Sequence, residues 1–238
     1  MIRKTEAIVL NTRKFGDSSL ICTLYTKLYG RKNFLIKGYR SAKSQKRHSY
    51  FQPMSIIEVV FYHREGRELQ LITESASRHY FHRLQTDPLR ITLGMVVVEM
   101  FYLSVREEAE RNDALFGFLA SVLVTLDEWE DKLIHVFIWF MLHLTRFLGF
   151  FPHQEEVLDA EVPLYFDLRE GLFQSAPSAR ASDVLLRDFS TMNLLECRDL
   201  RFSNADKKEM VSSLLQYYQL HVEGFRVPES LKVLEQVF

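Results

Sequence analysis

The chain has 238 residues, 47% of them hydrophobic and 26% charged, a composition that excludes an intrinsically disordered or fibrous protein. Its longest apolar run, residues 133–144, is interrupted by two histidines and is shorter than the roughly 18 to 20 residues that a membrane span requires. Two distant cysteines, and no apolar leader before the first predicted strand, indicate a reducing cytoplasm.

The near-neutral net charge hides an asymmetry between two parts of the chain. Residues 1–82 hold 15 Lys and Arg against 6 Asp and Glu, or +9, whereas residues 83–238 hold 15 against 25, or −10. The length also exceeds the usual size of one domain. We therefore expect two domains, of which only the first can bind a polyanion unaided.

The pattern in the first 75 residues is typical of short strands separated by turn residues. The predicted strands cover residues 6–12, 19–25, 32–37, 54–62 and 68–73. Gly16 and Gly66 mark tight turns, because glycine accepts the positive φ that a short hairpin requires. Short antiparallel strands with a long basic loop before the fourth predict a small closed OB-type barrel, although an SH3-like barrel would give a similar pattern.

The pattern changes to a helical period after residue 80. Predicted helices begin near Asp87-Pro88, Asn112-Asp113, Asp131 and Ser203. The third, about residues 131–148, is apolar almost all round and should be buried before Gly149 ends it, and Gly224 should close the last helix. The sequence therefore predicts an α+β chain, with an OB-type barrel in residues 1–80 followed by a helical domain in residues 81–238.

Residues 18–57 form a basic stretch that contains no Asp or Glu. Its aromatic residues are Tyr25, Tyr29, Phe34, Tyr39, Tyr50 and Phe51. Lys and Arg displace the counterions of a polyanion while aromatic faces stack bases, so the mixture suits single-stranded nucleic acid. The alternative is a solvated basic loop whose aromatic neighbours pack into the core.

Nine residues of this region are candidate nucleic-acid contacts. They are Lys27, Arg31, Lys32, Lys37, Tyr39, Arg40, Lys43, Lys46 and Arg47. The segment between the third and fourth strands of an OB-type barrel crosses the outside, so its cations should be exposed. Lys32 and Lys37 stand at odd spacing on one strand, so at most one of them shares a face with Phe34.

Motifs of catalysis are missing from the sequence. There is no GxGxxG, GxxxxGK[ST], GxSxG or HExxH, so we expect a protein that is not an enzyme and has no cofactor. His79 and His82 are three apart and would share one face of a helix, but no further ligands stand at a matching spacing, which argues against a metal site.

Short motifs along the chain resemble, in order and spacing, those of the RecO family of recombination mediators. They are Thr5–Leu10 (TEAIVL), Gly16–Ile21 (GDSSLI), Leu24–Thr26 with Gly30, Ile36–Arg40 (IKGYR), Phe51–Pro53 (FQP) and Gly149–Pro152 (GFFP). Each motif is short, but their collinear succession before a helical domain is specific. The resemblance covers most of the chain.

The resemblance implies an OB-fold domain and a helical domain that act without catalysis. Members of the family bind single- and double-stranded DNA, anneal complementary strands, and work with RecR to place RecA on DNA coated by single-stranded-DNA-binding protein (SSB). Many members carry a four-cysteine zinc site after the buried helix. Residues 153–181 contain no Cys here, so we expect a metal-free hairpin at about residues 153–176 and folding without zinc.

Two main classes of function follow from these patterns. The first is a DNA-repair mediator, cytoplasmic and nucleoid-associated; the second is an RNA-binding or ribosome-associated OB protein, because stacking does not distinguish the sugars. A third is an adaptor whose basic loop docks on an acidic protein. SSB tails are acidic and end in an aromatic residue, so Lys132 and Arg146 are candidate docking cations, unless they merely solvate the helix ends.

Overall fold

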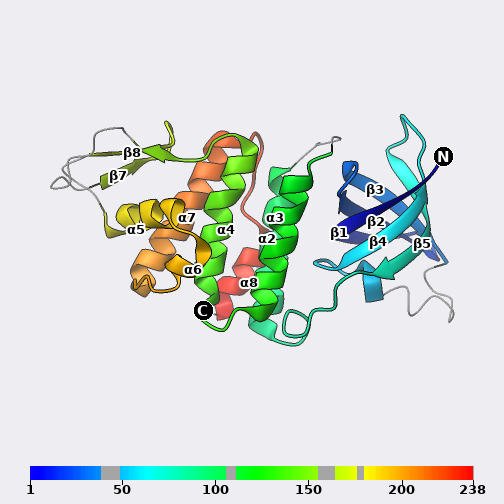
Figure 1. Ribbon diagram of the computed structural model, residues 1–238, viewed down its shortest axis with the longest axis horizontal. Helices are drawn as coiled ribbons and strands as arrows, with labels where there is room; N and C mark the ends of the chain where they lie inside the picture. Colours follow the sequence, from blue (N-terminus) through cyan, green and yellow to red (C-terminus); the bar gives the residue numbers. More distant parts are fainter. Residues whose placement is uncertain (39–48, 106–110, 155–163, 176–179, 238) are drawn as a thin grey trace. The chain divides into compact units, whose positions relative to one another are not determined.

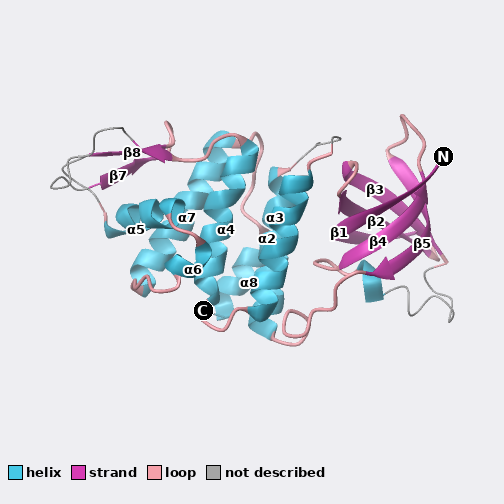
Figure 2. Ribbon diagram, in the orientation of Figure 1, coloured by secondary structure: helices cyan, strands magenta, loops and turns pink. Residues whose placement is uncertain are grey.

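The computed structural model describes residues 1–38, 49–105, 111–154, 164–175 and 180–237 (Figure 1). It divides into two compact units, Met1–Glu128 together with Pro228–Phe238, and Trp129–Val227. Strands occupy the first part of the first unit and helices follow them along the chain (Figure 2). Among the described residues, no helix combines the length and the apolar character that crossing a membrane requires.

The first unit begins with a closed barrel of five strands, which confirms the predicted fold class. The strands are β1 (Ile2–Phe15), β2 (Ser19–Thr26), β3 (Gly30–Lys37), β4 (Ile56–Tyr62) and β5 (Leu69–Ser77). Their order is β1-β2-β3-β5-β4, and β4 pairs with β1 to close the barrel. This is the order of an OB-type barrel, and the SH3-like alternative is set aside.

Two details of the barrel differ from the prediction. The pairing of β3 with β5 is parallel, because the β4–β5 hairpin returns the chain alongside β3 at the point where the barrel closes. β1 is also longer than predicted, since it pairs with β2 along one part and with β4 along the other. A register shift between Val9 and Asn11 lets this strand bend around the barrel.

Inward-facing apolar side chains from the strands fill the barrel: β1 to β4 supply its buried residues, Ile72 on β5 packs against them partly buried, and the 3-10 helix η2 (Ser49–Phe51) adds one more. The cluster comprises Ala7, Val9, Leu20, Cys22, Leu24, Phe34, Ile36, Phe51, Ile57, Val59 and Phe61. Phe34 and Phe61 meet edge to face with ring centroids 5.1 Å apart. Because strand side chains alternate, the neighbours of these residues point outward and form the barrel's outer surface.

Helices α2 (Pro88–Ser104), α3 (Asp113–Glu128) and α8 (Glu229–Val237) complete the first unit. Asp87 caps α2, as predicted, by accepting hydrogen bonds from Leu89 N and Arg90 N. α8 was not predicted. The Glu99 carboxylate on α2 accepts hydrogen bonds from the backbone N–H groups of Glu229 and Ser230, at 2.9 Å each, and so caps a helix 130 residues further along the chain.

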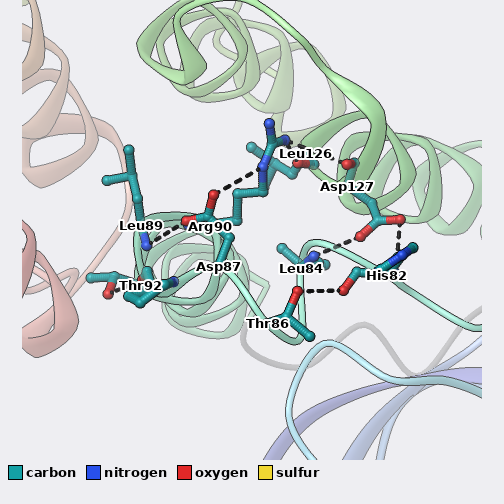
Figure 3. Close-up of polar contacts among 10 residues, drawn as sticks. His82, Leu84, Thr86, Asp87, Leu89, Arg90, Thr92, Leu126 and Asp127 are labelled. Carbon is teal, nitrogen blue, oxygen red and sulfur yellow. Dashed lines mark hydrogen bonds and ion pairs between the residues drawn. The ribbon is translucent and has the colours of Figure 1, made fainter.

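A buried carboxylate fixes the connection between β5 and α2 (Figure 3). Asp127, at the end of α3, accepts hydrogen bonds from His82 N at 3.1 Å and Leu84 N at 2.6 Å. The Arg90 guanidinium reaches the same helix end and donates to Leu126 O. These contacts hold the connection between barrel and helices in one conformation.

The second unit is built around α4 (Leu133–Leu148), which is buried almost all round as predicted and ends at Gly149 with a φ of 85°. A sheet follows, made of β6 (His153–Gln154), β7 (Leu164–Asp167) and β8 (Leu172–Ser175). β7 and β8 pair antiparallel, which confirms the predicted hairpin.

The stretch after this hairpin, where no helix was predicted before Ser203, contains α5 (Ala181–Thr191) and α6 (Leu194–Cys197). α5 is short and mostly polar, and its buried face includes Ser182 and Asp183, so an apolar pattern did not reveal it. α7 (Asn204–His221) begins with the predicted capping box at Ser203. It ends at His221, one turn before Gly224, because Val222 is already extended.

Candidate nucleic-acid interface

One part of the barrel's outer surface carries cations that are paired with carboxylates. β1 and β4 place Glu6 directly opposite Glu58, a repulsive arrangement for like charges. Lys4 Nζ lies 2.7 Å from Glu58 and Lys27 Nζ lies 3.1 Å from Glu6, while Arg78 Nε lies 3.6 and 3.7 Å from the two carboxylates. The hydrogen bond from Lys4 lowers the pKa of Glu58 below its usual value, against a smaller opposing effect of burial. This surface is electrostatically satisfied.

Two of the predicted nucleic-acid contacts also bind within the first unit. The Lys27 ammonium lies 5.9 Å from the centre of the Phe116 ring on α3. The Arg31 guanidinium lies 5.0 Å from the Tyr102 ring on α2 and donates a hydrogen bond to Tyr102 O at 3.0 Å. Cation–π and hydrogen-bond contacts of this kind stabilise the packing of the barrel on these helices. Both residues therefore already have protein partners.

A groove of about 600 Å³ lies on the outer surface of the barrel, where β3, β5 and the β4–β5 loop meet. Its lining residues in the described part of the chain are Leu35, Lys37, Tyr62, Arg64, Arg67, Glu68, Leu69, Gln70 and Leu71. Three of these are cations, Lys37, Arg64 and Arg67, and all three are exposed. No carboxylate in the described part of the chain lies within ion-pair distance of any of them. Their positive charge is therefore available to an external anion.

The loop that carries Arg64 and Arg67 is held by one buried side chain. Gln70 is 4% exposed, and its Nε2 donates to Arg64 O at 2.9 Å and to Arg67 O at 2.7 Å. Its Oε1 accepts from Arg64 N at 3.0 Å. Gly66 turns the loop with a φ of 72°. The amide thus fixes the loop backbone at both arginines, which pre-organises them beside the groove.

The remaining predicted contacts fall into two groups. Lys37 lines the groove on the outer face of β3. Lys32 is half-buried and lies two residues before Phe34, on the same face of the strand, so only one of the two lysines shares a face with Phe34, as expected. The others, Tyr39, Arg40, Lys43, Lys46 and Arg47, lie outside the described residues. Their contact with DNA stays a prediction.

Arg64 and Arg67 were missed as candidate contacts, because the sequence assigned them only to a turn. The available signal was their position in the loop between the fourth and fifth strands, one of the loops that OB folds use to bind oligonucleotides. His79 and His82, in contrast, lie in the connection before α2 and not on a helix, so the shared helical face was wrong. No group of three or more metal-ligating side chains occurs among the residues that the structure describes.

In the second unit, α4 carries the predicted docking cations. Lys132 is exposed at its N-terminus, and Arg146 lies in its last turn with the guanidinium 4.1 Å from the centre of the Phe151 ring. The His143 ring stacks on Trp139 at 4.1 Å and lies 5.6 Å from Phe151. Burial, assisted by the nearby Arg146 charge, lowers the pKa of His143 to about 4, so this imidazole is neutral at pH 7. Arg146 therefore stands beside an uncharged aromatic cluster.

The barrel order, the exposed groove between its loops, and the helices that follow define a class, that of OB-fold proteins with a helical C-terminal part. Sequence comparisons identify the family within this class. A profile described as "Recombination protein O N terminal" matches residues 1–81, and one described as "Recombination protein O C terminal" matches residues 85–230. The chain therefore belongs to the RecO family of DNA repair proteins.

Full-length relatives agree with this assignment. The chain is 33% identical over 244 residues to "DNA repair protein RecO" of Christiangramia forsetii, covering 100% of both chains. It is 32% identical over 243 residues to the protein of the same name from Flavobacterium johnsoniae, covering 99% of this chain and 98% of the relative. The protein of that name from Phocaeicola vulgatus is 32% identical over 244 residues, with 100% of both chains covered.

Proposed function

We propose that this RecO-family protein is a recombination mediator that binds single- and double-stranded DNA through its barrel, without catalysing a reaction and without zinc. The observation that carries the proposal is the convergence of Lys37, Arg64 and Arg67, unpaired with any described carboxylate, on a groove of an OB-type barrel. Such cations bind phosphates and release their counterions whatever the sequence. Sequence-independent binding is what DNA repair at arbitrary sites requires.

Strand annealing follows from the same charges. Two complementary strands repel each other, and a protein that neutralises their phosphates lowers this barrier while leaving the pairing edges of the bases accessible. We propose that the barrel acts in this way on DNA coated by SSB, and that the protein works with RecR to help RecA load there. Residues 1–80 would then contact DNA and residues 81–238 the protein partners, with the protein located on the nucleoid.

The surface near Arg146 suits the SSB tail, which combines carboxylates with a terminal aromatic ring. The cation and the rings of Phe151, His143 and Trp139 offer the two matching chemistries next to each other. Replacing Lys132 and Arg146 with Glu should weaken binding of a tail peptide. Replacing Arg169 and Lys208, two exposed cations of the same unit, makes the same charge change and should not. Equal effects in the two variants would remove this surface from the proposal.

The test of the function is an annealing assay. Complementary oligonucleotides are coated with SSB, and duplex formation is followed with and without the protein. We expect the wild type to accelerate annealing, and a variant with Lys37, Arg64 and Arg67 replaced by Ala to accelerate it much less. The same assay with RNA strands tests the RNA-binding alternative. If the protein does not accelerate annealing of SSB-coated DNA strands, or accelerates annealing of RNA strands more, the mediator function is refuted.

A further inference from the structure

A row of apolar side chains crosses the outer face of the barrel beside the groove cations Lys37, Arg64 and Arg67. Ile2 on β1 stands opposite Tyr62 on β4, Tyr62 stands opposite Leu71 on β5, and Leu71 is level with Leu35 on β3. Ile2 is 60% exposed and Tyr62 is 44% exposed. Along each strand of a barrel in water, inward apolar residues usually alternate with outward polar ones, so the outer face is mostly polar. A contiguous apolar row across four strands of that face therefore marks a binding surface.

Tyr62, Leu71 and Leu35 line the groove together with the three cations and the single carboxylate of Glu68 among its described lining residues. A surface for phosphates alone needs no apolar lining. An aromatic ring surrounded by aliphatic side chains is what an unstacked base requires, because a base can stack on the ring face while the phosphates on either side reach cations. The groove therefore combines the two chemistries that a single nucleic-acid strand presents.

We propose that Tyr62 is the anchor of a subsite for an unpaired base, so that the groove binds single strands by stacking as well as by charge. The inference rests on the proposed DNA-binding function and adds to it the state of the DNA that this groove recognises. In a duplex the bases are stacked and paired inside the helix, so a duplex can offer the groove only its phosphates. Duplex DNA then binds by charge alone, and single strands gain the additional stacking contact.

The position of Tyr62 supports this role. It is the last residue of β4, directly before the β4–β5 loop, so the backbone that places the ring also leads into the two arginines. The loop is fixed in turn by the hydrogen bonds of Gln70. The volume of about 600 Å³ lies within the range of roughly 300 to 1,000 Å³ typical of small-molecule pockets, large enough for a base.

The experiment compares two single strands of equal length and charge, a thymidine oligonucleotide and an abasic oligonucleotide that carries only sugar and phosphate. Wild type should bind the thymidine strand more tightly. Tyr62→Leu should reduce this preference by roughly 5- to 150-fold, the range for one stacked base, and leave duplex binding unchanged. Tyr62→Phe keeps the ring face and should keep the preference. Tyr80→Leu removes an aromatic ring that is 79% exposed but does not line the groove, and should have no effect.

The outcomes separate the inference from the function beneath it. If wild type binds none of the DNA probes, the proposed DNA-binding function is refuted and the subsite with it. If wild type binds DNA but Tyr62→Leu, folded as shown by an unchanged Tm, keeps the full preference for bases, only the subsite is refuted. An acidic peptide of the same charge that binds as tightly as the thymidine strand, and loses affinity in Tyr62→Leu, would assign the groove to a protein partner instead.

Discussion

Removing the positive charge around the groove should change how DNA binding depends on salt. Each phosphate contact on a single strand contributes about 0.7 to the slope of log affinity against log salt concentration. Replacing Lys37, Arg64 and Arg67 with Ala should therefore lower that slope by about 2 if each contacts one phosphate. Between 50 and 200 mM salt, a fourfold change, wild type would then lose roughly 18-fold more affinity than the variant. Fluorescence anisotropy of a mixed-sequence oligonucleotide across a salt series measures both slopes.

The matched control replaces the paired cations Lys4, Arg78 and Arg111 with Ala, which changes the net charge equally. Exposed ion pairs contribute only about 0 to 1 kcal/mol each, so this variant should stay folded, and its slope should remain close to that of wild type. Equal slopes for the two triple variants would mean that only net charge matters. An unchanged slope for the groove variant would refute the site. If the slope then fell in a variant with Arg40, Lys43 and Arg47 replaced by Ala, the DNA would bind at the basic loop instead.

Four further predictions concern single features of the chain. Gln70→Leu should weaken DNA binding because the loop that carries Arg64 and Arg67 loses its hydrogen bonds to the Gln70 amide. The substitution should therefore add little to a variant that already lacks these two arginines, and additive losses of affinity in this double-mutant cycle would contradict the role of Gln70 in positioning them. Gly171→Ala places a Cβ at a φ of 65° and against the Tyr217 hydroxyl, and should lower the free energy of unfolding by about 1–3 kcal/mol. Gly16 has a similar positive φ, 59°, but open space around its Cβ position, so an equal loss of stability for Gly16→Ala and Gly171→Ala in denaturant titrations would exclude the steric contact. Burial alone would raise the pKa of Asp127, but backbone hydrogen bonds from Leu84, His82 and Arg83 hold it below its usual 3.8. The Asp127 carboxylate therefore stabilises the folded protein above that pH, and this stabilisation is lost as the pH falls through the lower folded-state pKa. Asp127→Asn should accordingly lower Tm at pH 7 and lower it less in acid. A difference in Tm between wild type and variant that does not change with pH would contradict this. Washing with a chelator should leave Tm unchanged, and stoichiometric zinc in the washed sample would refute metal-free folding.

Local signals predicted the elements that local chemistry determines. Gly66 allows the β4–β5 turn, Asp87 caps α2, and Ser203 opens α7 with a capping box, all within a few residues of their partners. Runs rich in β-branched and aliphatic residues, separated by turn residues, likewise indicated the strands of the barrel. The helices that were missed have a different origin. α8 is capped by Glu99, 130 residues away, and no pattern near Glu229 shows that contact.

The same limit applies to the candidate site. Composition indicated that the first 82 residues would bind a polyanion, but it could not distinguish paired from unpaired cations. Arg31 lies in the basic stretch, yet its partner Tyr102 is 71 residues away and is brought near only when the barrel packs on α2. Arg64 and Lys37 line one groove because β5 pairs in parallel with β3, a pairing that depends on closure of the barrel.

The cap that Glu99 provides for α8 has a consequence for the order of folding during translation. The first unit needs residues from Pro228 onward, so the whole of Trp129–Val227 must be synthesised before it is complete. At about 5 to 20 residues per second, the ribosome takes roughly 5 to 20 s to make that segment. During this interval the surface of α2 that later holds Leu231 and the rest of α8 is uncovered on the nascent chain. The barrel can therefore close before α8, the last helix of the same unit, has been synthesised.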